Sequence, residues 1–267
     1  MNVISLTALD LTLAAGLVLI LAALSMPMGL GIGKQLVVAA ARTVVQLLLI
    51  GFVLKALFEN VNLGWVALLA AVMLLIAGRE AMARQTRRLL GWWGFGVGTV
   101  SMFVSTFAIT VLALTVIIGT EPWYTPQYAI PLLGMMLGNT MTGIAVALDR
   151  LTQTAWQSRD IIEARLMLGQ TSTVAIADIR SDSMRSGMIP VINAMAAAGV
   201  VSLPGMMTGQ ILAGTPPLEA VKYQILIMFM IGSGTGFGTM AAVWAASRRL
   251  FDERERLRLE RTRTVAK

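Results

Sequence analysis

The 267-residue sequence contains neither cysteine nor histidine. Without cysteine, disulfide bonds and thiolate metal sites are excluded. Without histidine, the chain lacks the commonest metal ligand and the side chain that most often carries protons near neutral pH. Serine hydrolases built on a Ser–His pair and zinc peptidases built on an HExxH helix are therefore excluded as well.

Charged residues are also scarce, at 13% of the chain, whereas hydrophobic residues make up 57% and the mean hydropathy is +0.76. Apolar runs of about 20 residues, each long enough to cross a bilayer, recur along the sequence. The first run has no basic residue before it, so we expect a permanent span and not a cleaved signal peptide. The prediction is an all-α polytopic membrane protein with about seven transmembrane helices, near residues 7–26, 35–55, 62–79, 95–118, 128–148, 188–212 and 220–247.

The net charge of +7 indicates membrane topology here, not affinity for nucleic acid. With seven spans, nearly all lysines and arginines of the connections fall on one side, which the positive-inside rule assigns to the cytoplasm. The N-terminus is then outside and the C-terminus cytoplasmic. We expect residues 1–250 to form the transmembrane domain and residues 251–267 a charged tail. The tail is predicted to be a mixed-charge helix that extends the last span and either contacts lipid headgroups or binds a partner.

The longest connection between predicted spans covers residues 149–188, within the transmembrane domain. It carries five acidic and five basic side chains, which balance to zero. A connection of this length in a compact bundle is typical of a functional segment or of disorder. Its good helix formers and its i,i+4 charge spacing, as between Arg159 and Glu163, favour short helices.

Few polar residues fall inside the predicted spans. Arg42 and Gln46 lie one turn apart on the second span, so they share one face of that helix. Two interpretations are open. Either Arg42 extends its long side chain to the nearby cytoplasmic interface, or both residues line a translocation path.

A short motif occurs twice, as GMMLGN in the fifth predicted span and as GMMTGQ in the sixth, each after a proline. By the predicted topology, both copies lie in the outer half of the membrane at similar depth. Small residues allow helices to approach closely, whereas flexible thioethers beside an amide suit an adaptable substrate cavity. Both interpretations stay open, and the candidate path residues of the motifs are Met135, Met136, Asn139, Met206, Met207 and Gln210.

The sequence offers no energy source of its own. The glycine-rich run GLGIGK (29–34) lacks the spacing of a phosphate-binding P-loop, and Gln35 follows where a hydroxyl is needed. A proton-coupled carrier needs buried acids, whereas the acids of the apolar segments lie near predicted span ends: Asp10, Glu59, Glu80, Glu121, Asp149 and Glu219. We therefore expect no cofactor and no catalysis by this chain, and active transport would require energy from another chain.

Part of the long connection resembles a known signature. EARLMLG (163–169) is similar to the Glu-Ala-Ala-x3-Gly sequence with which permeases of ATP-binding-cassette (ABC) importers contact their ATPase, although an arginine replaces the second alanine. Ile179 follows the glycine by ten residues, as in that signature. The resemblance implies that this stretch docks on an ATPase through a short helix, with coupling residues Arg159, Glu163, Ala164, Arg165 and Gly169.

Two further stretches, PLLGMMLGNTMTGIAVALDRL (131–151) and IPVINAMAAAGVVSLPGMMTGQILAGTPPLEAVKYQI (189–225), complete a more specific resemblance. Together with IEARLMLGQT (162–171), they resemble the FetB family of permeases, the membrane subunits of an iron-exporting ABC transporter. The resemblance spans residues 35–247 and leaves the tail outside. It implies a multi-pass protein of the bacterial inner membrane, paired with a second copy of itself and with a cytoplasmic FetA-like ATPase, in contact with lipids and with no nucleic acid.

The identity of the metal ligands stays unknown. An intramembrane metal site in this chain would use methionine sulfur, which suits Cu(I), or amide, hydroxyl and carbonyl oxygen or acids near the mouth of the path, whose oxygens suit harder iron. The residues permit iron, and the resemblance favours it. A second class of function, a self-sufficient channel or secondary carrier for a small solute, predicts transport without nucleotide together with internal repeats or broken helices.

Overall fold

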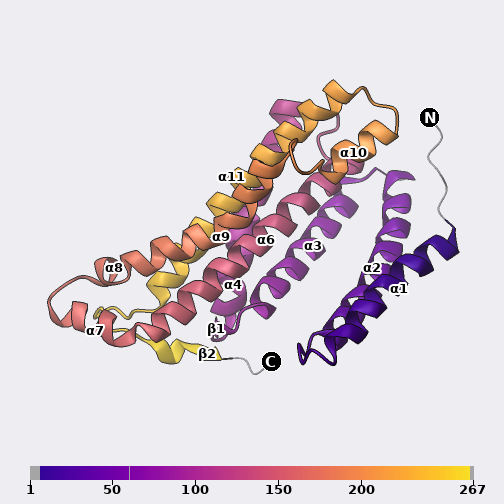
Figure 1. The fold of residues 1–267 in the computed structure, drawn as a ribbon. Helices are drawn as coiled ribbons and strands as arrows, with labels where there is room; N and C mark the ends of the chain where they lie inside the picture. The colour runs from indigo at the N-terminus through magenta and orange to yellow at the C-terminus, as the bar shows by residue number, and fades with distance from the viewer. Residues whose placement is uncertain (1–6, 60, 265–267) are drawn as a thin grey trace.

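The structure is a computed structural model that describes residues 7–59 and 61–264. It is almost entirely helical, as predicted (Figure 1). The α-helices are α1 (Ala8–Ser25), α2 (Gly33–Glu59), α3 (Leu63–Ala83), α4 (Trp92–Met102), α5 (Ala108–Leu112), α6 (Pro126–Gln157), α7 (Arg159–Met167), α8 (Ser172–Ala175), α9 (Ala177–Ala197), α10 (Gly205–Leu212) and α11 (Pro217–Arg249). The other elements are the π-helical segments η1 (Phe103–Phe107) and η2 (Ala113–Ile118), the 3-10 helix η3 (Leu259–Arg261), and the strands β1 (Arg87–Leu89) and β2 (Thr262–Thr264).

Six helical segments of the described residues are long and apolar enough to cross a membrane: α1, α2, α3, Trp92–Ile118, α6 and α11. They confirm six of the predicted spans. The segment Trp92–Ile118 is continuous but not α-helical throughout, because η1 and η2 flank α5 within it. A π-helical turn contains one extra residue and is frequent at functional sites.

The sixth predicted span, 188–212, is wrong as a single helix. The chain forms α9, which begins at Ala177, then breaks over residues 198–204 and resumes as α10. Gly199 has a φ of +82°, and Pro204 precedes α10 without an N–H to donate, so the backbone cannot continue α9. Because α10 lies at the end where α11 begins, α9 and α10 together still carry the chain across the bundle (Figure 1).

Helices α6, α9 and α11 form the centre of the bundle, with α3 and α4 beside α6 (Figure 1). One hydrophobic cluster fills the end near α7, and a second one lies around Met136 toward α10. Glycine permits the closest crossing: a methyl group on Gly187 of α9 would lie 2.6 Å from the carbonyl oxygen of Gly143 of α6. The backbones of these two helices are therefore in direct contact.

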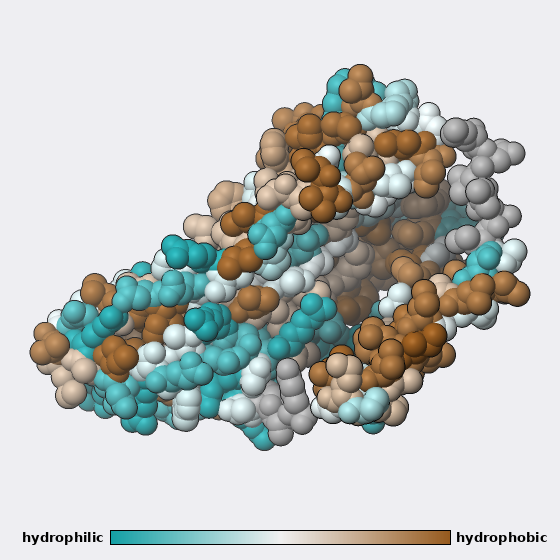
Figure 2. Space-filling view, in the orientation of Figure 1, coloured by the Kyte–Doolittle hydropathy of each residue, from teal (hydrophilic) through white to brown (hydrophobic). Residues whose placement is uncertain are grey.

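Helices α1 and α2 form a hairpin beside the bundle (Figure 1). The surface is hollowed between this hairpin and the bundle (Figure 2). The hairpin closes tightly because Gly33 has no side chain, since a Cβ atom there would lie 2.9 Å from the carbonyl oxygen of Ala22. Near the other end of α2, Leu57 joins the second hydrophobic cluster. Most other apolar side chains of the hairpin are exposed, as expected for helices that face lipid or another membrane protein.

The basic connections gather at one end of the molecule, together with α7, β1 and β2 (Figure 1). At this end, Arg87 stacks over the ring of Trp156 at 3.7 Å, and the backbone N–H of Ser172 donates to Glu255 of the tail at 3.0 Å. The grouping agrees with the topology expected from the basic residues. That this end faces the cytoplasm stays a prediction.

The tail does not extend α11 as a helix, which corrects the prediction. After Arg249 the chain turns back, and β2 pairs antiparallel with β1 of the connection between α3 and α4. Leu259 is buried in the first hydrophobic cluster. The guanidinium of Arg261 donates to the carbonyl oxygens of Arg249 and Phe251 at 3.0 and 2.9 Å, which satisfies acceptors left free at the end of the helix. Long-range contacts of this kind outweigh the helical pattern of the charges.

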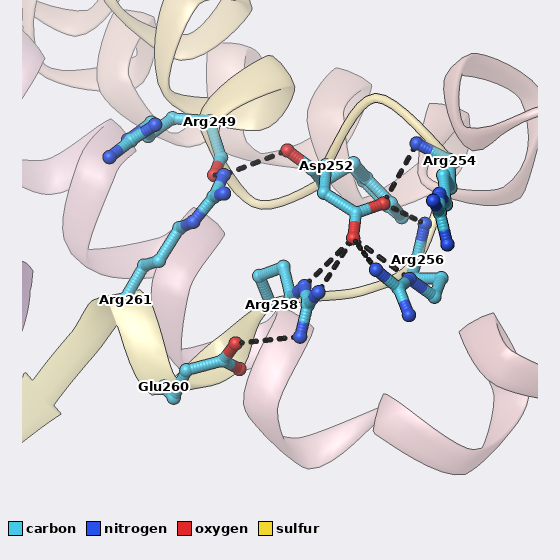
Figure 3. A network of polar contacts seen from close by, with 8 residues as sticks. Arg249, Asp252, Arg254, Arg256, Arg258, Glu260 and Arg261 are labelled. Atoms are coloured by element: carbon cyan, nitrogen blue, oxygen red, sulfur yellow. Dashed lines mark hydrogen bonds and ion pairs between the residues drawn. The ribbon is translucent and has the colours of Figure 1, made fainter.

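Asp252 organises the turn that follows α11 (Figure 3). Its carboxylate accepts the backbone N–H of Arg256 and the side-chain N–H groups of Arg256 and Arg258, each at 2.9 Å. The backbone bond from Arg256, assisted by the two guanidinium groups and opposed by partial desolvation, holds the pKa of Asp252 well below its ordinary value of 3.8. A carboxyl with a lowered pKa in the folded state stabilises that state fully above its ordinary pKa. It loses this contribution as the pH falls below that value.

We expect Asp252→Asn to release the tail from the connection between α3 and α4. The amide removes the negative charge and turns an N–H group toward two guanidinium groups. The measurement is hydrogen exchange at the amide of Leu90, which donates to the carbonyl oxygen of Arg261 at 2.8 Å. In the unsubstituted chain this protection is expected to persist at neutral pH and to fall only below pH 3.8. The control is Glu253→Gln, an equal charge change on an exposed side chain, and equal exchange in both variants would contradict the role of Asp252.

Candidate functional site

The predicted coupling stretch forms a helical protrusion at the far end of the bundle (Figure 1). α6 runs on without a break to Gln157, α7 and α8 form the tip, and α9 leads back from Ala177 into the bundle. The prediction of short helices in residues 149–188 is thus confirmed. Because α6 and α9 both reach the bundle centre, the protrusion is continuous with the core helices.

The inner side of α7 is fixed to the protrusion. Ile162 is 1% exposed and belongs to the first hydrophobic cluster. Arg165 donates to the carbonyl oxygen of Ala175 at 3.1 Å and forms an ion pair with Asp178 at 2.9 Å, which ties α7 to α8 and α9. Gly169, with a φ of +85°, follows the end of α7 and permits the tight turn there. Arg165 therefore holds the shape of the protrusion, although its replacement of an alanine suggested a docking charge.

The outer side of α7 is free of contacts with the rest of the described chain and carries both charge and apolar surface. Arg159 and Glu163 form the expected i,i+4 ion pair at 2.8 Å, and Ala164 beside them is exposed. Met167 and Leu168 are 82% and 83% exposed, although the surface around them is largely hydrophilic (Figure 2). We call the exposed apolar residues of this side the apolar tip: Ile161, Ala164, Met167 and Leu168.

Sequence reasoning did not select Met167 and Leu168 as site residues. A signal was present, because both directly precede the helix-ending Gly169 inside an otherwise charged stretch. Large apolar side chains exposed at the polar end of a protein typically mark an interaction surface. The geometry thus provides a rigid helix end that can insert apolar side chains into a cleft of another protein.

The repeated Gly-Met-Met motifs lie at the other end of the bundle. Met136 belongs to the second hydrophobic cluster, and Met135 and Met206 pack against it, so the two copies come together as expected from their predicted depth. Met136 is 1% exposed and packs on Gly234 of α11. Asn139 is exposed and donates to the carbonyl oxygen of Met135 at 2.8 Å.

The motif glycines differ in their surroundings. A methyl group on Gly134 would lie 3.3 Å from the Cε atom of Met73 in α3, so close packing at this position stays a prediction. A methyl group on Gly138, Gly205 or Gly209 would meet no atom of the described structure within 4 Å. Met207 is half-buried, and the Oε1 atom of Gln210 is buried without a hydrogen-bond partner among the described residues. A lining role for these side chains stays a prediction.

The side chain of Arg42 extends from α2 toward α3, and its role in a translocation path stays a prediction. Its guanidinium forms an ion pair with Glu80 of α3 at 2.9 Å, while Gln46 one turn further is exposed. The pair joins the α1–α2 hairpin to α3 of the bundle. Sequence reasoning placed Glu80 near a span end and missed this partner, because 38 residues separate the two side chains.

The residues that the structure describes include no group of three or more acidic side chains that could hold a metal ion. Neutral donors are present at the repeated motifs: methionine sulfur, amide and hydroxyl oxygen, and backbone carbonyl oxygen. Such donors bind weakly, which suits a substrate in passage better than a resident ion.

Known proteins resemble this chain over most of its length. The model of the family described as Uncharacterised protein family (UPF0014) matches residues 8–251. A UPF0014 membrane protein of Synechocystis is 41% identical over 232 residues, 86% of this chain and 88% of the relative. The Escherichia coli protein named Probable iron export permease protein FetB is 32% identical over 263 residues, 96% of this chain and 97% of the relative. Protein ALUMINUM SENSITIVE 3 of Arabidopsis thaliana is 34% identical over 225 residues, 83% and 80% of the two chains. No solved structure matches this chain.

Proposed function

This chain is a multi-pass membrane protein of the UPF0014 family, and we propose that it is the permease subunit of an ABC transporter that exports iron or a related metal cation. The observation that carries the proposal is the apolar tip, held on a rigid protrusion at the basic end of the molecule. In a bacterial host, a multi-pass helical protein of this kind lies in the inner membrane, where this end faces the ATP-containing cytoplasm.

The apolar tip supports a partner of stated chemistry. A cleft that receives it must be lined with apolar side chains around Met167 and Leu168, and with charges complementary to Arg159 and Glu163 at the rim. A cytoplasmic ATPase subunit supplies such a surface, together with the energy source that this sequence lacks. Two permease copies and two ATPase copies form the assembly, because ABC ATPases act as pairs.

The arrangement of α6 and α9 supports a mechanical route from the ATPase to the membrane. When ATP binding draws two ATPase subunits together, each tip moves with the subunit in which it is docked. α6 is one unbroken helix from the tip to the second hydrophobic cluster, so a displacement of its outer end tilts the whole helix. Arg165 keeps α7 and α9 together during this movement through its bonds to Ala175 and Asp178.

Iron as the cargo is supported by the printed name of the Escherichia coli relative and by the donor set. Oxygen donors near the motifs, such as Asn139 and Gln210, suit a hard cation, whereas the neighbouring methionine sulfurs add soft donors. A second candidate, a self-sufficient channel or secondary carrier, is favoured by one observation, the broken helix formed by α9 and α10.

One experiment separates these functions. The full chain is co-purified with a candidate ABC ATPase subunit from its own organism and reconstituted into liposomes, and Fe²⁺ movement is followed with and without ATP. The proposal expects movement that requires both the ATPase and ATP. Equal movement of Fe²⁺ by the chain alone, without nucleotide, would refute it in favour of a channel or carrier.

We expect Glu163→Lys to weaken co-purification with the ATPase, most strongly at low salt, without changing membrane insertion. The substitution breaks the ion pair with Arg159 and reverses a charge at the rim of the apolar tip. Glu253→Lys is the matched control, because it makes the same change on an exposed side chain of the tail at the same end of the molecule. If both variants retain the ATPase equally, Glu163 is not a docking residue.

A further inference from the structure

The interior of the bundle holds hydroxyl groups without partners. Among residues 7–59 and 61–264, five threonines have a buried Oγ1 atom without a hydrogen-bond partner: Thr110, Thr140, Thr154, Thr235 and Thr239. Thr140 and Thr239 have no exposed surface, and Thr235 is 1% exposed. An unpaired buried hydroxyl destabilises a fold, and membrane helices cannot obtain a partner from the surrounding lipid. Several of them together indicate that another group binds there.

These threonines differ from the other helical threonines of the chain. A helical threonine usually donates to the carbonyl oxygen four residues earlier. Seven threonines of the described residues do so: Thr43, Thr99, Thr106, Thr115, Thr142, Thr152 and Thr208. The unpaired hydroxyls leave this local bond unmade, so they are directed to a partner outside their own helix.

Three of the threonines with unpaired hydroxyls lie where α6 and α11 cross, each against a glycine of the opposite helix. A methyl group on Gly143 of α6 would lie 3.0 Å from Oγ1 of Thr239 and 2.6 Å from Cγ2 of Thr235. A methyl group on Gly238 of α11 would lie 2.7 Å from Oγ of a serine in η1 and 2.7 Å from Cγ2 of Thr140. We call this group of side chains the hydroxyl seam, formed by Ser105, Thr140, Thr235 and Thr239.

The seam is closed on the side toward α10. Met136, one turn before Thr140, packs on Gly234, the residue before Thr235. On another side, Gly187 of α9 lies against Gly143 and Thr239. A methyl group added to Gly187 would lie 2.8 Å from Cγ2 of Thr239. The seam is therefore walled by α6 and α9, the two helices that run to the apolar tip. A movement of the tip must change the width of the seam.

We propose that the hydroxyl seam is the hydrated constriction of the translocation path, closed in the present conformation. This inference rests on the proposed function and adds the chemistry by which the cargo passes. Each threonine hydroxyl both donates and accepts, so an opened seam exchanges hydrogen bonds with the water shell of a hard cation. Neutral oxygen ligands hold such an ion weakly enough for release. Ordered water and a hydrated cation offer the seam the same oxygen chemistry, and the test separates them.

The lack of native cysteine allows a direct test of water access. Three single variants of the full chain are made: Thr140→Cys, Thr235→Cys and Thr239→Cys. Each is produced in membranes together with the candidate ATPase subunit. Each cysteine variant is treated with a cationic, membrane-impermeant methanethiosulfonate reagent, which labels thiols that water reaches, with and without ATP. The control is Thr106→Cys, because Thr106 is equally buried but donates to the carbonyl oxygen of Met102 at 2.6 Å. Labelling of the seam positions during ATP turnover is expected to be at least about tenfold faster than at the control.

Valine variants separate a path from a structural water site. Thr→Val removes the hydroxyl and keeps the shape of the side chain. Because the hydroxyls of Thr235 and Thr239 are unpaired, the double variant is expected to unfold at the same temperature as the original chain or a higher one. Thr106→Val loses a made bond and is expected to unfold at a lower temperature. Fe²⁺ transport in liposomes is expected to fall at least about tenfold in the double variant alone.

Each outcome either supports or overturns the proposal that the hydroxyl seam is the translocation path. Fast labelling of the seam together with loss of Fe²⁺ transport in the stable double valine variant supports the path. Labelling no faster than at Thr106 in either nucleotide state overturns it, and so does fast labelling with unchanged Fe²⁺ transport, which would indicate ordered water only. If the unsubstituted chain moves no Fe²⁺ with its ATPase, the proposed function fails, and this result is read independently of the labelling rates.

Discussion

Replacing both Met167 and Leu168 with glutamine is expected to abolish ATP-driven transport while the chain stays inserted and folded. The two side chains are 82% and 83% exposed, so they contribute little to the stability of the chain alone. Their apolar surface faces water at the end of the protrusion unless a partner covers it. The substitution therefore acts on the partner and not on the fold.

The expected size of the effect follows from burial. An aliphatic side chain that becomes fully buried contributes about 1.5–3 kcal/mol, so two such side chains contribute about 3 kcal/mol or more. Each 1.4 kcal/mol corresponds to about a tenfold change in affinity. The affinity of the double variant for the ATPase is expected to fall by about a hundredfold or more, as measured by titration of the purified subunits in detergent.

A matched pair of residues provides the control. Val200 and Val201, in the turn between α9 and α10, are also adjacent, apolar and highly exposed, at 87% and 83%. They lie at the opposite end of the molecule from the apolar tip (Figure 1). Glutamine carries no charge, so neither double variant alters the basic residues that set topology. Full ATP-driven Fe²⁺ transport by Met167→Gln with Leu168→Gln would remove the apolar tip from the mechanism.

Features that depend on neighbouring residues could be predicted from the sequence. Apolar run length gives the membrane class and six spans, because a helix satisfies its own backbone in lipid. The i,i+4 spacing of Arg159 and Glu163 and the glycine at position 169 define α7 for the same local reason. The resemblance of the long connection to a coupling signature could be read without the fold.

Features that depend on contacts between residues far apart in the sequence could not be predicted from it. The tail folds back because β2 pairs with β1, which lies far away in the sequence. Such long-range pairing produces no pattern among neighbouring residues of the sequence. The partner of Arg165 is Asp178 on another helix, so the sequence did not show that this charge also holds α7 to α9. Gly199 and Pro204 signalled the break between α9 and α10 in the sequence. The predicted span missed it because the length of an apolar run depends on side chains alone, whereas the break depends on backbone conformation.

The candidate transport residues show the same division. The sequence selected glycine, methionine and amide side chains by composition, yet helix faces decide their roles. Gly138 faces open space, whereas Gly143, five residues later on the same helix, lies against two threonines and another backbone. The hydroxyl seam has no motif at all, because it combines single residues from three segments of the chain.

Gly187→Ala is expected to destabilise the bundle, whereas Gly138→Ala is expected to leave it unchanged or more stable. A methyl group on Gly187 would lie 2.6 Å from the carbonyl oxygen of Gly143 and 2.8 Å from the Cβ of Ala147. Real Cβ atoms do not approach so closely, and a backbone carbonyl inside a helix cannot rotate away. The two helices must separate, and such overpacking costs typically about 1–3 kcal/mol.

Gly138 is the matched control because it lies on α6, the other helix of this crossing, and receives the same added methyl group. No atom of the described structure lies within 4 Å of that group, and alanine is a better helix former than glycine by about 1 kcal/mol. The two variants are therefore expected to shift the midpoint of thermal unfolding of the detergent-solubilised chain in opposite directions. Because α9 carries the return path from the apolar tip, Gly187→Ala is also expected to lower the coupling of ATP hydrolysis to Fe²⁺ transport. Equal unfolding midpoints for the two variants would contradict the direct contact of the α6 and α9 backbones, and with it the mechanical link between the tip and the seam.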